Sequence, residues 1–124
     1  MGAAAERARR YLRTAEAARA PGDHESAASR AYYAMFFVAR ALLRAEGADP
    51  KTHRGAHVPF HERLVRSGRL PAELARAFDD AWALRELAEY GDEPALGHDE
   101  ADAALAAARA FVSALEPLLP DDAA

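Results

Sequence analysis

Proline and glycine divide this chain into segments in which apolar residues recur at helical spacing, and this division is the strongest constraint on its fold. The apolar residues of the first segment follow the i, i+3, i+4, i+7 pattern of one helix face: Ala8, Tyr11, Leu12, Ala15 and Ala18. Pro21-Gly22 ends that segment, and Asp23 is a suitable N-cap for the next. The same signals predict helices over residues 4–20, 24–46, 59–67, 71–90 and 98–116.

Composition supports this helical interpretation. Alanine is the most abundant residue of the chain and the strongest helix former, and no segment alternates with the two-residue period of a strand. Short loops between amphipathic helices favour antiparallel neighbours. We therefore predict an all-α, up-and-down bundle of four to five helices, a single domain over residues 1–120 with a disordered tail at 121–124.

Several classes of protein are excluded by what the chain lacks. It has 124 residues, which suits one domain, and no cysteine, which excludes disulfides and thiolate chemistry. No uncharged apolar run approaches the length of a membrane-spanning helix, and the first residues lack the apolar core of a signal peptide. We therefore expect a cytoplasmic protein without membrane association.

Charge is distributed unevenly along the chain. Residues 1–70 carry 13 Lys and Arg against 7 Asp and Glu, a net charge of +6, whereas residues 71–124 carry 3 against 13, a net charge of −10; together they give the total of −4. Such a division predicts either a basic surface for an anionic partner or salt bridges between the two halves.

The segment 24–46 has apolar residues around most of its circumference, as expected of a central helix. Its remaining face interleaves arginines with aromatic rings: Arg30, Tyr33, Phe37, Arg40 and Arg44. Arginine binds phosphate and rings stack on bases, so this face predicts RNA or nucleotide binding. A dimer interface and an ordinary solvated surface are the two alternatives.

Arg85 falls in the middle of the apolar face of the segment 71–90, with Glu89 one turn later. An unpaired buried guanidinium is costly, so Arg85 needs a partner or a polar cavity. One hypothesis is an internal Arg85–Glu89 pair that stabilises the bundle. The other is a polar pocket or a cleft between two copies of the chain.

Three histidines, His53, His57 and His61, are spaced by four residues. On one continuous helix they would share a face and could bind zinc. Pro59, however, suits the first turn of a helix, which would leave residues 53–57 in a preceding loop. We therefore predict no metal site and no cofactor.

Three motifs resemble those of HEPN-domain proteins, in particular their small bacterial and archaeal branch. They are S-R-A-Y-Y-A-M-F-F at residues 29–37, K-T-H-R-G at residues 51–55 and R-E-L-A-E-Y at residues 85–90, which match S-R-x-Y-Y-A-x-F-H, K-T-H-x-G and R-x-x-A-D/E-Y in order and spacing. The resemblance implies a helical bundle that forms homodimers. It also implies pairing, in many members, with a minimal nucleotidyltransferase as toxin and antitoxin.

Many HEPN proteins are metal-independent ribonucleases with an R-x4-6-H motif, and the resemblance therefore implies catalytic candidates here. Arg85 matches the motif arginine, but Tyr90 occupies the histidine position, and Phe37 replaces the histidine of the first motif. His53 is the remaining histidine candidate, provided that folding brings it beside Arg85. The predicted catalytic residues are thus Arg85, Tyr90 and His53. The predicted RNA-binding or nucleotide-binding residues are Arg30, Tyr33, Phe37, Arg40, Lys51, Arg54 and Glu89.

We expect first a toxin-like or partner subunit of a nucleotidyltransferase pair that binds RNA or nucleotide at a dimer cleft. The alternatives are a metal-independent endoribonuclease and a non-catalytic nucleotide-binding or structural helical module.

Overall fold

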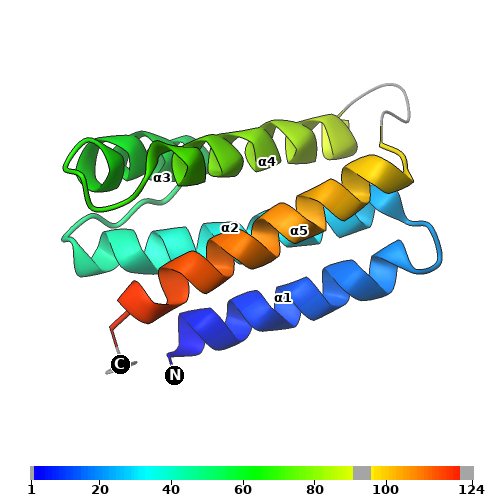
Figure 1. The fold of residues 1–124 in the computed structure, drawn as a ribbon, viewed down its shortest axis with the longest axis horizontal. Helices are drawn as coiled ribbons and strands as arrows, with labels where there is room; N and C mark the ends of the chain where they lie inside the picture. The colour runs from blue at the N-terminus through cyan, green and yellow to red at the C-terminus, as the bar shows by residue number, and fades with distance from the viewer. Residues whose placement is uncertain (1, 91–95, 121–124) are drawn as a thin grey trace.

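A computed structural model describes residues 2–90 and 96–120, and all the regular elements in these ranges are helical. The elements are α1 (Ala3–Arg19), α2 (His24–Ala45), α3 (His53–Pro59), η1 (Phe60–Val65), α4 (Ala72–Tyr90), α5 (His98–Leu115) and η2 (Glu116–Leu118) (Figure 1). The all-α prediction is confirmed. The predicted tail at 121–124 lies outside the described residues.

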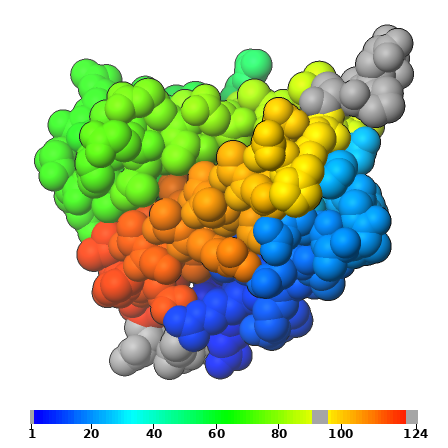
Figure 2. Space-filling model, turned by 45° about the vertical axis from the view of Figure 1, so that its right-hand side comes forward, coloured from blue at the N-terminus to red at the C-terminus, as the bar shows by residue number. Residues whose placement is uncertain are grey.

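Four long helices form the bundle, and α2 is its centre. It contacts α1, α4 and α5, and its buried residues lie around most of its circumference, as its sequence predicts. The start of α1 and the end of α5 lie at the same end of the bundle (Figure 1). On the face shown in Figure 2, α5 lies between α4 and α1 and covers the core.

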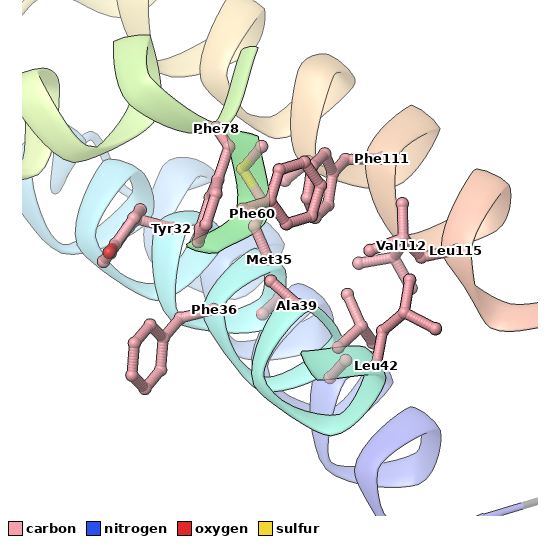
Figure 3. Close-up of a cluster of buried hydrophobic side chains, with 14 of the residues drawn as sticks. Tyr32, Met35, Phe36, Ala39, Leu42, Phe60, Phe78, Phe111, Val112 and Leu115 are labelled. Atoms are coloured by element: carbon pink, nitrogen blue, oxygen red, sulfur yellow. The ribbon is translucent and has the colours of Figure 1, made fainter. Parts of the chain in front are cut away.

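Aromatic and aliphatic side chains from four elements meet in the core. Phe60 of η1 and Phe78 of α4 both stack on Phe111 of α5, with ring centroids 5.6 and 5.3 Å from it. Met35 of α2 lies beside these rings, and Tyr32 sits at the edge of the cluster with its hydroxyl turned away from them (Figure 3). The most buried side chains are therefore contributed by helices far apart in the sequence.

The prediction that a helix begins at Pro59 is wrong. The helix α3 begins at His53, with Thr52 as its N-cap, and Pro59 is its last residue. Because proline lacks an N–H, it interrupts the α-helical hydrogen bonds at this point, and the chain continues in the wider π-helical turns of η1. His53 and His57 consequently lie on a helix, not in a loop.

Some charged residues of the basic and acidic halves of the chain form ion pairs with each other. Arg9 and Arg19 of α1 pair with Glu116 and Asp102, and Arg109 of α5 pairs with Glu16. These ion pairs join α1 to the C-terminal part of the chain. The arginines on the outer face of α2 take no part in them. In the described part of the chain, no helix has the length and apolar character needed to cross a membrane.

Candidate functional site

A cleft with a volume of about 740 Å³ lies between α1, α2, α4 and the start of α3. Basic and aromatic side chains make up much of its lining: Arg7, Arg30, Arg40 and Lys51, with Tyr11, Tyr33, Phe36, Phe37 and His53. Glu25 and Glu89 add two carboxylates. The cleft thus gathers most of the predicted binding residues, together with His53, on one surface.

The rings and the cations of the cleft contact one another. The guanidinium of Arg7 lies 4.0 Å from the centroid of the Phe37 ring, and Tyr11 meets Phe37 edge-on at 4.9 Å. At the other end, Lys51 bonds to Asp49 at 3.2 Å, and Arg40 lies 4.0 Å from the same carboxylate. These contacts hold several of the basic and aromatic side chains of the cleft in position.

Arg85 lies behind the cleft wall, with 8% of its side chain exposed. Its Nη2 donates to the Tyr33 hydroxyl at 2.7 Å and pairs with Glu89 at 2.9 Å, while Nη1 donates to Glu86 at 2.9 Å. Burial alone would lower the pKa of Arg85, but Tyr33 and Glu89 together raise it, so the guanidinium stays charged. The predicted Arg85–Glu89 pair exists, and it supports the wall of a polar cleft.

The local sequence explains how Lys51 and His53 are placed. The Oγ1 of Thr52 accepts a hydrogen bond from the backbone N–H of Gly55 at 2.9 Å, which caps α3. A Cβ at Gly55 would lie 2.8 Å from that oxygen, so glycine keeps the cap undistorted. The cap begins α3 with the ring of His53 4.8 Å from Phe36 at the cleft.

A hydrogen-bond chain connects His53 to Asp79 through the buried side chains of Tyr32 and His57. The Tyr32 hydroxyl lies 3.0 Å from Nδ1 of His53 and 2.9 Å from Nε2 of His57. Nδ1 of His57 lies 2.7 Å from one oxygen of Asp79, and Nε2 of His61 lies 2.7 Å from the other. Tyr32, His57 and Asp79 were not predicted as site residues from the sequence, although the four-residue histidine spacing was a usable signal.

Burial keeps His57, His53 and Tyr32 neutral. The ring of His57 is stacked between Phe78 and Trp82, with centroids 3.8 and 4.4 Å away. This burial lowers the pKa of His57, and Asp79 opposes the effect. Burial, followed by the positive charge of Arg85, also lowers the pKa of His53, whereas burial raises the pKa of the Tyr32 hydroxyl.

The sequence profile of the HEPN domain family matches residues 1–118. The chain belongs to the HEPN family. It is 40% identical over 94 residues to a UPF0332 protein of Archaeoglobus fulgidus, which is 73% of this chain and 72% of that protein. A protein of Methanocaldococcus jannaschii named "Putative toxin MJ0605" is 31% identical over 99 residues, 79% of this chain and 72% of that protein.

Another match covers less of the relative. A UPF0332 protein of Gloeobacter violaceus is 48% identical over 63 residues, which is 51% of this chain and half of that protein, 50%. The match therefore spans about half the length of that relative.

Three predicted residues do not line the cleft of this HEPN domain. Arg54 is exposed beyond it, and Arg85 contributes through Tyr33 and Glu89. Tyr90 is 68% exposed at the end of α4, with its ring centroid 5.7 Å from the Arg85 guanidinium. Tyr90 lies beside Arg85, and Arg85 contacts the cleft residues Tyr33 and Glu89. Of the three predicted catalytic residues, only His53 lines the cleft.

Within residues 2–90 and 96–120, no three His, Asp or Glu side chains are arranged to hold a metal ion. His57 and His61 instead direct one nitrogen each at Asp79. The cleft itself brings together one histidine, His53, and four basic side chains.

Proposed function

We propose that this HEPN domain is the toxin-type subunit of a two-protein pair and that its cleft binds RNA or a nucleotide. One observation carries the proposal: four basic side chains and several aromatic rings line the same cleft as His53. Two relatives from Methanocaldococcus jannaschii whose names begin "Putative toxin" support the toxin assignment.

The chemistry of the cleft suits an RNA ligand. Arg30 and Arg40 are on one face of α2 and can bind phosphate oxygens through two parallel hydrogen bonds. Tyr33 and Phe37 lie on the same face and offer rings on which bases stack, a contact worth about 1–3 kcal/mol per base. The volume of about 740 Å³ falls within the ~300–1,000 Å³ typical of small-molecule sites, so it can hold a nucleotide of a longer strand.

Two partners belong to this proposal. The first is a second copy of the chain, because α4 exposes the apolar side chain of Leu87 and the ring of Tyr90, and Tyr90 lies beside Arg85. The second is a minimal nucleotidyltransferase, whose basic surface would meet the acidic C-terminal half of the chain. Light scattering after gel filtration measures the first, and affinity capture from the native host followed by mass spectrometry measures the second. A monomer at high concentration, or capture without a nucleotidyltransferase, contradicts the respective partner.

RNA binding is tested by fluorescence anisotropy with a labelled single-stranded RNA. The double variant Arg30→Ala/Arg40→Ala should bind at least about tenfold more weakly, and its salt slope should fall by about 1 for each phosphate that it no longer binds. The matched control is Arg66→Ala/Arg76→Ala, which removes two exposed arginines outside the cleft. Equal weakening of both double variants would mean that the cleft is not the RNA site.

A second candidate function is metal-independent RNA cleavage, and the position of His53 in the cleft favours it. In such a reaction His53 takes the proton from a 2′-hydroxyl, and the 2′-oxygen attacks the adjacent phosphorus. The bond from phosphorus to the 5′-oxygen then breaks, the 5′-oxygen takes a proton from water, and a 2′,3′-cyclic phosphate remains. Arg30 and Arg40 are the cations that can stabilise the added charge on the phosphate.

Cleavage is tested with total RNA in the presence of a chelator. His53→Asn is the informative variant, because its amide can still donate to Tyr32 but provides no base at the position of Nε2. Wild-type protein should cleave and His53→Asn should not. An inactive wild type, or equal cleavage by both proteins, removes the ribonuclease candidate and leaves RNA binding as the function.

A further inference from the structure

The direction of every hydrogen bond between Asp79 and His53 follows from the atoms involved. An ionised carboxylate only accepts hydrogen bonds. Nδ1 of His57 and Nε2 of His61, each 2.7 Å from an oxygen of Asp79, must therefore both carry a hydrogen. Asp79 thus determines that His57 has its proton on Nδ1.

The next bond follows from the neutrality of His57. This ring is 4% exposed and is stacked between Phe78 and Trp82, and burial lowers its pKa. A neutral imidazole has a single N–H, which here donates to Asp79. Nε2 of His57 is therefore an acceptor, and the Tyr32 hydroxyl, 2.9 Å away, donates to it.

Tyr32 has one hydroxyl hydrogen, which is directed at His57. Towards His53, 3.0 Å away, its oxygen can only accept, so Nδ1 of His53 must donate. The proton of neutral His53 is thus on Nδ1, and Nε2 keeps its lone pair. Nε2 makes no hydrogen bond within the described residues, and it is not among the buried polar atoms that lack a partner, so it is open to solvent at the cleft.

We propose that Asp79, His57 and Tyr32 are positioning residues that hold His53 as its Nδ1–H tautomer, with Nε2 as an unprotonated base facing the cleft. The inference deepens the proposed ribonuclease function and rests on it for its use in a reaction. In water, histidine prefers the opposite tautomer, with the proton on Nε2. That tautomer would place two lone pairs between Tyr32 and His53 and would lose a hydrogen bond. The hydrogen bonds from Asp79 to His53 should therefore favour the Nδ1–H form of His53 by roughly tenfold or more.

Titratable and charged groups from α2 and α4 surround His53. Tyr32 and Tyr33 approach it from α2, and Arg85, Glu86 and Glu89 act on it from α4. Arg85 disfavours a second proton on the ring, whereas the two glutamates favour it. Because burial and Arg85 prevail and the pKa of His53 is lowered, the ring is neutral at the pH where its tautomer is measured.

The tautomer is measured on ¹⁵N-labelled protein by long-range ¹H–¹⁵N correlation of the histidine rings, because protonated and unprotonated ring nitrogens differ widely in chemical shift. Wild-type His53 should show an unprotonated Nε2. Tyr32→Phe should shift His53 towards the Nε2–H tautomer, and Asp79→Ala should give a mixture. The matched control is His61→Ala, which removes the other partner of Asp79 and should leave the His53 tautomer unchanged.

A wild-type protein with Nε2–H at His53 overturns the proposal, whatever the variants do. An unchanged His53 tautomer in a folded Tyr32→Phe variant also overturns it, and an unchanged tautomer in Asp79→Ala removes Asp79 from the chain. Backbone amide spectra of each variant establish that it is folded. The measurement needs no RNA, so it remains decisive even when the wild type proves inactive.

Activity separates this inference from the function on which it rests. If RNA is cleaved, Tyr32→Phe should reduce the cleavage rate by about tenfold or more, the size of the lost tautomer preference, with unchanged RNA affinity. Wild-type protein that has the predicted tautomer but does not cleave refutes the ribonuclease function alone. Wild-type protein that cleaves with Nε2–H at His53 refutes the positioning role alone.

Discussion

Arg85→Ala should destabilise the bundle by about 2–4 kcal/mol, because Arg85 is a buried cation that joins two helices. Removing one partner of a buried ion pair costs about 3–5 kcal/mol, whereas an exposed pair contributes only about 0.2–1 kcal/mol. The Arg85 side chain is 8% exposed, but its partner Glu89 is 30% exposed. Ser29 also donates to Glu89 at 2.6 Å and would still do so in the variant. Water and Ser29 therefore offset part of the loss, which places the expected value near the lower end of the buried range.

Urea unfolding measures this loss, with far-UV circular dichroism and Trp82 fluorescence as two probes that should coincide. Glu89→Gln and the double variant complete a mutant cycle, in which we expect a coupling free energy of about 1–2 kcal/mol. The control is Arg76→Ala, an exposed arginine on the same helix, with a change within about 0.5 kcal/mol. If Arg85→Ala costs no more than Arg76→Ala, the guanidinium is solvated and the structural reasoning fails.

Three further predictions concern the elements around the site. Thr52→Ala should lower the free energy of unfolding by about 1 kcal/mol through loss of the α3 cap, measured by urea unfolding; an unchanged value would mean that the bond from Gly55 contributes nothing. Because the pKa of folded His57 is lowered, the folded state binds its proton less readily than the unfolded chain. Stability should therefore fall as the pH drops below the unfolded pKa of about 6.5, as followed by urea midpoints, and a midpoint that rises would contradict the buried neutral ring. Arg19→Ala should lower the urea midpoint less than Arg85→Ala does, because its pair with Asp102 is exposed to solvent, and this difference from the wild type should shrink at high salt.

Most helix boundaries could be predicted because their signals are local. Pro21-Gly22 and the cap of Asp23, whose carboxylate accepts from the N–H of Ser26, separate α1 from α2 as expected. The predicted helix start at Pro59 is wrong because proline is favoured in a first turn but is also tolerated at the end of a helix, here where the π-helical η1 begins. The stronger signal is Thr52, whose hydroxyl caps α3 at His53.

The site was predicted in part. The arginines and rings on the outer face of α2 form one wall of the cleft, and their periodicity alone placed them together. The arrangement of Arg85 with Glu89 followed from their spacing of four residues. Asp79 could not be found in this way, because it lies 22 residues from His57 and 18 from His61 in sequence, and no local pattern joins a single carboxylate to histidines on another helix.

The sequence by itself determined the four long helices, the basic and aromatic face of α2 and the Arg85–Glu89 pair, since these depend on hydrogen bonds and side-chain neighbours within one or two turns. Only the tertiary structure decided that Asp79, His57, Tyr32 and His53 form one chain. Its geometry depends on how α2, α3 and α4 are rotated against one another by the packing of Phe78 and Trp82 around His57. Burial, which exists only once the helices have packed, then keeps His57, His53 and Tyr32 neutral.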